Sequence, residues 1–280
     1  MWCNMMKQNK TFHYGEFIKK ILVGLLLGIA WITPGLSAGV ITAAAGLYEP
    51  IVHAIVNFPK EYQKSIRLLF PIGLGVGCGI LLFSRVMQEL LVIAKFPVLY
   101  LFLGLVAGST PALFKEANQG GFRKRFIGAA LLAFGVVMVT GQLIPGVTET
   151  GGSELNAFTA LLCGAVVAFG SIIPGISSSL ILMYLGFYEQ FLAAVAGLNL
   201  RLLVLMGVGF GLIALLLLNL VDYLFRRYRG IAYHGVLGVL FGSMVLIFPG
   251  FRPGMALVLD LVYFLAGAAL SFGTMHLSAR

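Results

Sequence analysis

The chain has 280 residues, of which 60% are hydrophobic and only 10% are charged, and its formal net charge is +9 at pH 7. Soluble domains carry about 25% charged residues, so this composition excludes a soluble globular protein and predicts a chain that lies mostly in lipid. The Lys and Arg residues gather in short segments between apolar stretches, which favours a role in membrane orientation over nucleic-acid binding.

Apolar segments recur along the whole chain, and most are long enough to cross a hydrocarbon core of about 30 Å. We therefore predict an all-α polytopic membrane protein. A cytoplasmic N-terminal segment at 1–17 precedes a first membrane repeat at 18–145, an external connecting loop at 146–156 and a second membrane repeat at 157–280. The expected apolar segments are 18–33, 36–57, 66–86, 97–113 and 126–144 in the first half, and 157–173, 176–198, 202–222, 233–249 and 255–276 in the second.

Sequence patterns recur in the same order in the two halves. Pro-Gly-x-Ser occurs at 34–37 and 174–177, and a Tyr-Glu pair occurs at 48–49 and 188–189, both at an offset of 140 residues. An ordered series of this kind indicates a duplicated unit. Three further matches share an offset of 134: Arg67-Leu68-Leu69 with Arg201-Leu202-Leu203, Gly-x-Gly-x-Gly at 73–77 and 207–211, and Gly-x-x-x-Gly-Ser at 104–109 and 238–243.

Pro-Gly interrupts the first two apolar segments of each half, and proline both removes a backbone donor and clashes with the preceding turn. We expect bent helix pairs that either cross the membrane twice or re-enter it, with the re-entrant form favoured. Either alternative gives each half an odd number of crossings, so the second half is expected to be inverted relative to the first. Inverted repeats with broken helices at matching positions are typical of secondary transporters, whose substrate site lies at the breaks.

The basic residues predict the orientation of the chain. If the N-terminus is cytoplasmic, 15 of the 19 Lys and Arg residues lie on the cytoplasmic side, and the connecting loop at 146–156 contains none. This distribution follows the positive-inside rule and predicts that both termini are cytoplasmic. The four exceptions are Arg85, Lys95, Arg201 and Arg252.

The two Pro-Gly-x-Ser breaks are candidate anion sites. Ser37 and Ser177 follow Pro-Gly at the point where a new helix is expected to begin, so each can cap that helix. A helix start presents free N–H groups and the positive end of the helix dipole, which attract anions. The alternative is a bend with self-capping serines. The candidate substrate-binding residues at the breaks are Pro34, Gly35, Ser37, Pro174, Gly175, Ser177, Ser178 and Ser179.

Two arginines and two glutamates extend this candidate site. Arg67 and Arg201 open the third segment of each half on opposite faces of the membrane, and a guanidinium group pairs bidentately with phosphate. The alternative for each arginine is a charge that only sets the topology. Glu49 and Glu189 either take up a proton during transport, pair with an arginine, or end their helices in water.

Enzyme signatures are absent from the sequence. The four histidines are scattered, and there is no Gly-rich nucleotide loop, no HExxH and no Ser/His/Asp arrangement that the membrane layout could assemble. We therefore expect no metal, no cofactor and no ATP hydrolysis. Arg85 and Asp260 lie in or near apolar segments, which makes them functional candidates, but neither has a repeat partner of like charge and both rank lower.

Four motifs resemble those of the polyprenyl-phosphate transporter family: Pro-Gly-Leu-Ser-Ala-Gly at 34–39, Gly-Leu-Tyr-Glu at 46–49, Pro-Gly-Ile-Ser-Ser-Ser at 174–179 and Gly-Phe-Tyr-Glu at 186–189. The resemblance implies a flippase that returns undecaprenyl phosphate, the lipid carrier of cell-wall precursors, to the cytoplasmic leaflet of the bacterial inner membrane. It would thereby support cell-wall and envelope polysaccharide synthesis. The expected partners are the polyprenyl phosphate and membrane lipids, without nucleic acid. The phosphate would sit between the breaks while the prenyl tail stays in lipid.

The residues alone leave other functions open. These are a secondary transporter of a small soluble anion, an integral-membrane enzyme acting on lipid phosphates, and a non-catalytic assembly factor. A flippase is expected to have a groove open sideways to lipid, whereas a soluble-anion carrier is expected to have a closed central path. The driving force, the direction of transport and the oligomeric state are left open by the sequence.

Overall fold

The computed structural model describes residues 14–34, 47, 50–51, 53–54, 57–143, 155–173 and 176–278, and all regular structure within them is helical. This agrees with the predicted all-α class. The helices are α1 (Tyr14–Ile32), α4 (Tyr62–Ile93), α5 (Lys95–Asn118), α6 (Arg125–Leu143), α7 (Ala157–Ile172), α8 (Ser178–Tyr184), α9 (Tyr188–Ala196), α10 (Leu200–Arg227), α11 (Arg229–Ile247) and α12 (Met255–Ser278).

Six of the described helices are long and apolar enough to cross a membrane: α4, α5, α6, α10, α11 and α12. A seventh candidate span is the pair α8 and α9, whose axes bend by 118° at a short break. The long helices carry large apolar side chains on their outer surfaces; Leu215 of α10, for example, is 77% exposed. Such a surface is stable against lipid, so the prediction of a multi-pass membrane protein is confirmed at this level.

Glycines allow α1 to pack directly against the backbone of α4, and α7 against that of α10. A Cβ atom on Gly24 would lie 2.2 Å from the carbonyl oxygen of Ile72, and one on Gly164 would lie 1.9 Å from that of Met206. These two contacts are related by the offsets of 140 and 134 found in the sequence. Gly28, one turn beyond Gly24, similarly meets Val76, so α1 and α4 run in the same direction.

The remaining long helices pair across the two halves of the chain. α5 of the first half packs along α12 of the second, and α6 of the first half packs along α11 of the second. A Cβ atom on Gly104 would lie 2.0 Å from the carbonyl oxygen of Phe264, and one on Gly238 would lie 2.1 Å from that of Ala130. Both members of this second match are again 134 residues apart. Small residues at such contacts allow close helix approach in membranes.

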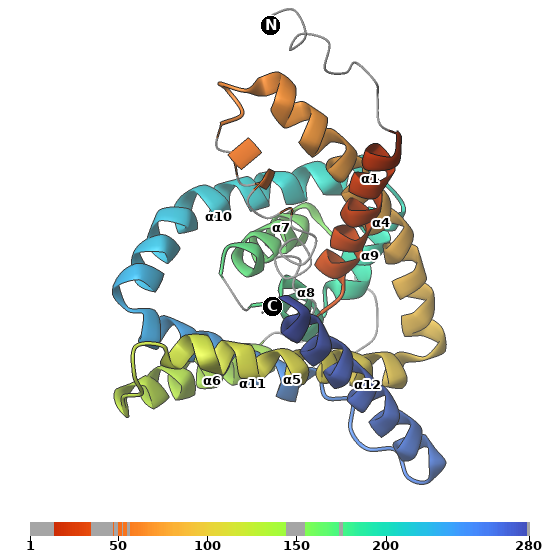
Figure 1. Cartoon of the computed structure of the whole chain (residues 1–280). Helices are drawn as coiled ribbons and strands as arrows, with labels where there is room; N and C mark the ends of the chain where they lie inside the picture. The colour runs from red at the N-terminus through yellow and green to blue at the C-terminus, as the bar shows by residue number, and fades with distance from the viewer. Residues whose placement is uncertain are drawn as a thin grey trace, which may run out of the picture.

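The short helices α7, α8 and α9 lie in the middle of Figure 1, with α4 and α10 curving around them and α5, α6, α11 and α12 together on one side. The main apolar core includes Met87 of α4, Cys163 of α7, Leu192 of α9 and Met206 of α10. Elements from both halves therefore meet in the centre of the molecule.

The predicted apolar segment 176–198 is not one continuous helix. It forms α8 and α9, which are separated at residues 185–187. Gly186 adopts a φ of +75°, a backbone conformation that favours glycine, so the turn depends on that residue. The sequence prediction missed this second break because it relied on Pro-Gly, and proline is absent here. The corresponding first-half segment, 36–57, lies largely outside the described residues.

Candidate functional site

The second Pro-Gly break lies between two described helices. α7 ends at Ile172 and α8 begins at Ser178, on either side of the predicted break at 174–175. Ser177 occupies the position immediately before α8 in an extended conformation, as predicted for a capping residue. Its side chain, however, makes no capping hydrogen bond to α8, so this part of the prediction is wrong.

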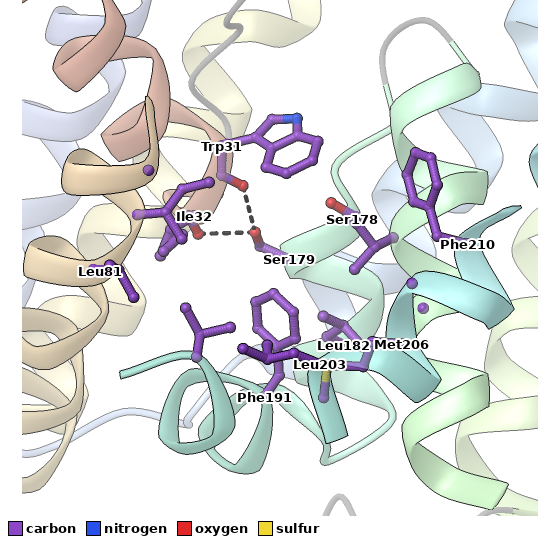
Figure 2. A pocket seen from close by; sticks show the side chains of 16 residues that line it. Trp31, Ile32, Leu81, Ser178, Ser179, Leu182, Phe191, Leu203, Met206 and Phe210 are labelled. Atoms are coloured by element: carbon purple, nitrogen blue, oxygen red, sulfur yellow. Dashed lines mark hydrogen bonds between the residues drawn. The ribbon is translucent and has the colours of Figure 1, made fainter. Parts of the chain in front are cut away.

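Hydroxyl groups from the second half hold the end of α1. Ser179 donates a hydrogen bond to the carbonyl oxygen of Ile32 at 2.8 Å, and Tyr188 donates one to the same oxygen at 2.9 Å. Ser179 also lies 3.3 Å from the carbonyl oxygen of Trp31, and Figure 2 shows both of its contacts. The last carbonyls of a helix have no partner within that helix, and Ile32 is the last residue of α1. The two hydroxyl groups therefore satisfy carbonyl oxygens that lipid would leave unpaired.

This joint changes the interpretation of two sequence motifs. Ser179 was expected to bind substrate, but its hydroxyl group is buried and already bonded to α1. Tyr188 was noticed only as the neighbour of a glutamate, yet it is 2% exposed and joins the two halves. Its recurrence with Tyr48 at an offset of 140 was the signal that could have identified it as more than an accompanying residue.

Tyr188→Phe and Ser179→Ala are each expected to lower the stability of the purified protein by about 1 kcal/mol, the usual net value of one hydrogen bond. The double variant leaves the Ile32 carbonyl without either hydroxyl donor and is expected to lose more. Thermal unfolding in detergent measures the effect. The matched controls are Tyr263→Phe, at an exposed tyrosine, and Ser109→Ala, whose hydroxyl group donates to Val106 within its own helix. A double variant as stable as the paired controls would contradict this assignment.

A cavity of about 350 Å³ lies beside this joint, and residues of α1, α4, α7, α8, α9 and α10 line it. Its lining is almost entirely aliphatic and aromatic. Ser178 and Ser179 contribute its only hydroxyl side chains, and no charged side chain is among the lining residues. Figure 2 shows Ser178 and Phe210 across the cavity from Ile32 and Leu81. The cavity therefore lies between elements of the first and second halves, next to the second Pro-Gly break.

The two arginines predicted to bind phosphate are exposed and do not line this cavity. Arg67 lies in the first turns of α4, and Arg201 lies in the first turn of α10. The structure thus brings neither guanidinium group to the cavity. Their role in capturing an anion from either face of the membrane remains a prediction.

The other three cations predicted on the external face have partners. Arg85 of α4 donates to the carbonyl oxygen of Ala196 at 3.3 Å, which links α4 to the end of α9. Lys95 Nζ lies 3.6 Å from the Glu189 carboxylate. Arg252 makes two hydrogen bonds to Asp260, at 2.9 and 2.5 Å. These contacts explain why such residues occur within and beside apolar segments.

Asp260 is more important structurally than its low sequence rank suggested. Its side chain has no exposed surface, and the bidentate bond from Arg252 compensates its charge. The Arg252 guanidinium also lies 4.5 Å from the centre of the Phe96 ring, and the Tyr100 hydroxyl donates to the carbonyl oxygen of Gly250 at 2.9 Å. The loop between α11 and α12 is thereby attached to α5 of the first half.

Glu189 begins a helix, so the alternative in which it ends one in water is wrong. It lies in the first turn of α9, where a negative charge interacts favourably with the helix dipole. Its partner is the lysine Lys95 rather than an arginine, and its side chain is 58% exposed. Exposed ion pairs of this kind contribute about 0–1 kcal/mol. A role in proton coupling is not tested by this geometry.

Several predicted site residues cannot be located in the structure. Pro34 is buried directly after α1. In the described ranges, no group of three His, Cys, Asp or Glu side chains is arranged to hold a metal ion. The predicted residues Gly35, Ser37, Glu49, Pro174 and Gly175 lie outside the described residues.

Long apolar helices, a helix pair bent by 118° and a cavity beside a helix break are the features of a multi-pass membrane transporter. More specifically, the chain belongs to the undecaprenyl phosphate translocase-like family, whose pattern matches residues 27–257. This is a transporter family, not a family of enzymes, and the match includes both Pro-Gly-x-Ser motifs. The sequence resemblance to polyprenyl-phosphate transporters is therefore confirmed.

Two characterised relatives support this assignment. The chain is 26% identical over 256 residues to the polyprenyl-phosphate transporter of Vibrio cholerae serotype O1, an alignment that covers 86% of this chain and 79% of the relative. It is also 26% identical over 274 residues to the polyprenyl-phosphate transporter of Staphylococcus aureus, covering 93% of this chain and 96% of the relative. No solved structure matches the chain significantly.

Proposed function

We propose that the protein is a flippase that returns undecaprenyl phosphate, or a closely related polyprenyl phosphate, to the cytoplasmic leaflet without hydrolysing ATP. The family match over residues 27–257 is the observation that carries this proposal. Transport of this kind recycles the carrier lipid and supports the synthesis of cell-wall and envelope polysaccharides. The location is the bacterial inner membrane, with both termini in the cytoplasm.

The proposed architecture is a pair of inverted repeats, with domain boundaries at 18–145 and 157–280. The recurrence of helix contacts at the sequence offsets supports the duplication. Arg85, in the last third of α4, contacts Ala196, which closely precedes α10. α10 therefore starts near the end of the membrane at which α4 finishes, which supports opposite directions for these two repeat-related helices.

The proposed phosphate site is at the two breaks. Its residues are Pro34, Gly35, Ser37, Pro174, Gly175, Ser177 and Ser178, with Arg67 and Arg201 capturing the phosphate from opposite faces. Ser179 supports the site by holding α1. Glu49 and Glu189 are the proposed groups for any coupling to protons, in which case Glu189→Gln removes the dependence on a proton gradient and leaves passive exchange.

A soluble-anion carrier is the main rival function, and the lining of the cavity disfavours it. A small anion that passes along such a surface loses its hydration without gaining a cation or several donors, which is costly in a medium of low dielectric constant. The cavity has no charged lining residue and only two hydroxyl side chains. An apolar lining instead suits a substrate with a hydrocarbon chain.

In proteoliposomes without nucleotide, the purified protein is expected to move a fluorescent polyprenyl phosphate between leaflets, as measured with a membrane-impermeant quencher. Arg201→Ala is expected to lower capture from the external side about tenfold or more, because a hydrogen bond to a charged group contributes roughly 1.5–3 kcal/mol. Arg67→Ala should have the larger effect from the cytoplasmic side. Lysine at either position should restore transport only partly, because it lacks the bidentate fork.

The controls are protein-free vesicles and a water-soluble phosphate analogue without the prenyl chain. Transport of this analogue as fast as the lipid would replace the flippase with a soluble-anion carrier. Equal effects of Arg67→Ala and Arg201→Ala from both sides would remove the two arginines from the proposed site while leaving the substrate assignment intact.

A further inference from the structure

The cavity beside the second break has a surface suited to hydrocarbon rather than to phosphate. Its walls include Trp31, Leu81, Leu203, Met206 and Phe210, and its volume is about 350 Å³. The hydroxyl group of Ser179 is already bonded to the end of α1. Without a lining cation, a phosphate inside the cavity would be poorly compensated. The cavity therefore calls for an apolar occupant.

The position of the cavity relates it to the proposed phosphate site. Trp31 and Ile32 line it three and two residues before Pro34, and Ser178 lines it four residues after Pro174. A phosphate held at the two breaks would thus lie beside the cavity, and the carbon atoms attached to that phosphate would lie next to its walls. Trp31 is 46% exposed and Gly207 is exposed, so the cavity is not sealed within the protein.

We propose that this cavity binds the isoprene units nearest to the phosphate, while the rest of the prenyl chain stays in lipid. The proposal rests on the proposed function and names the part of the lipid that the protein recognises besides its phosphate. Pockets of roughly 300–1,000 Å³ hold drug-sized molecules, so a volume of about 350 Å³ suits a few isoprene units and not the entire chain. The expectation that the whole prenyl tail lies in lipid is thereby replaced.

Shape, rather than hydrophobicity, is what such a cavity can recognise. Lipid chains are as apolar as the leucines and phenylalanines of the wall, so entry into the cavity gains little from leaving the bilayer. The gain comes from van der Waals contacts with fixed walls, which depend on the fit of the ligand. Isoprene units carry methyl branches and rigid double bonds, whereas unbranched alkyl chains do not. The cavity should therefore favour an isoprenoid phosphate over an alkyl phosphate of equal carbon number.

Four glycines offer a matched test of this proposal. Gly77 and Gly207 line the cavity, whereas their repeat partners Gly211 and Gly73 do not. A Cβ atom on any of the four would meet no atom within 4 Å, so leucine is tolerated by the backbone in every case. Leucine also raises the helix propensity equally at all four positions. Only Gly77→Leu and Gly207→Leu place a new side chain in the cavity.

The first measurement is photo-cross-linking of detergent-solubilised protein with farnesyl phosphate that carries a diazirine near its phosphate. Cross-links are expected on cavity residues such as Leu203 and Phe210, and unlabelled farnesyl phosphate should compete at least tenfold better than an unbranched C15 alkyl phosphate. Gly77→Leu and Gly207→Leu should reduce this cross-linking about tenfold, while Gly73→Leu and Gly211→Leu leave it unchanged. Cross-links outside the cavity, or equal yields from all four variants, would overturn the proposal.

The second measurement is polyprenyl phosphate transport by the same variants in proteoliposomes. Gly207→Leu and Gly77→Leu are expected to slow transport about tenfold relative to their repeat-partner controls. If the wild-type protein transports the lipid and all four variants match it, the cavity proposal fails and the proposed function stands. If the wild-type protein shows the cavity cross-links but transports nothing, the proposed function fails and isoprenoid binding stands.

Discussion

Replacement of Gly164 by leucine is expected to prevent the protein from accumulating in a folded form. A Cβ atom at this position would lie 1.9 Å from the carbonyl oxygen of Met206 and 2.6 Å from its carbonyl carbon. Both atoms belong to the backbone of α10, so no side-chain rotation can make room and α7 must move away from α10. The cost should exceed the about 1–3 kcal/mol of ordinary overpacking.

This expectation has a repeat-related counterpart and a nearby control. Gly24→Leu meets the carbonyl oxygen of Ile72 at 2.2 Å and should be similarly damaging. Gly211→Leu, on α10, meets nothing within 4 Å and should give a protein as stable as the wild type. The measurements are the yield of monodisperse protein in mild detergent and its unfolding temperature. If Gly164→Leu and Gly211→Leu gave equal yields and unfolding temperatures, the close contact between α7 and α10 would be wrong.

Arg252→Ala is expected to destabilise the protein by about 3–5 kcal/mol, because it leaves the carboxylate of Asp260 buried without a partner. Asp260 is fully buried and receives both of its charge-assisted hydrogen bonds from Arg252. Arg252→Lys should recover only part of the loss, since a lysine cannot make the bidentate contact. Thermal unfolding in detergent measures these differences.

Neutralising both partners provides the control for this prediction. Arg252→Met combined with Asp260→Leu removes the charge as well as its partner, and such apolar replacements of buried ion pairs are often neutral or stabilising. The double variant should therefore be more stable than Arg252→Ala alone. A double variant as unstable as Arg252→Ala would show that the contact of Arg252 with Phe96, rather than the charge of Asp260, causes the loss.

The contribution of Arg252 should not change with pH in the neutral range. The hydrogen bond to Asp260 raises the pKa of the Arg252 guanidinium above its ordinary value of 12.5. A raised pKa gives a stabilising contribution that is fully present below the ordinary value and is lost only as the pH rises through the folded-state value. Arg252 therefore stays charged wherever the protein is expected to function.

The sequence predicted the membrane class, the break after α7 and the glycine-based pairing of helices for local reasons. A chain with 10% charged residues cannot cover a soluble globule, and Pro174 cannot continue a helix. Glycines at repeated offsets mark positions where helices approach closely, although the sequence did not specify which helices meet. The structure pairs α5 with α12 and α6 with α11.

Tertiary contacts alone decided how the centre of the molecule is built. The bond from Tyr188 to Ile32 joins residues 156 positions apart, and that from Ser179 to Ile32 joins residues 147 positions apart. No local pattern predicts such partners, because a helix-ending carbonyl accepts a hydrogen bond from whichever donor the packing brings near. The cavity likewise depends on six helices at once. Local chemistry determined where helices break, while packing between the halves determined what surrounds the break.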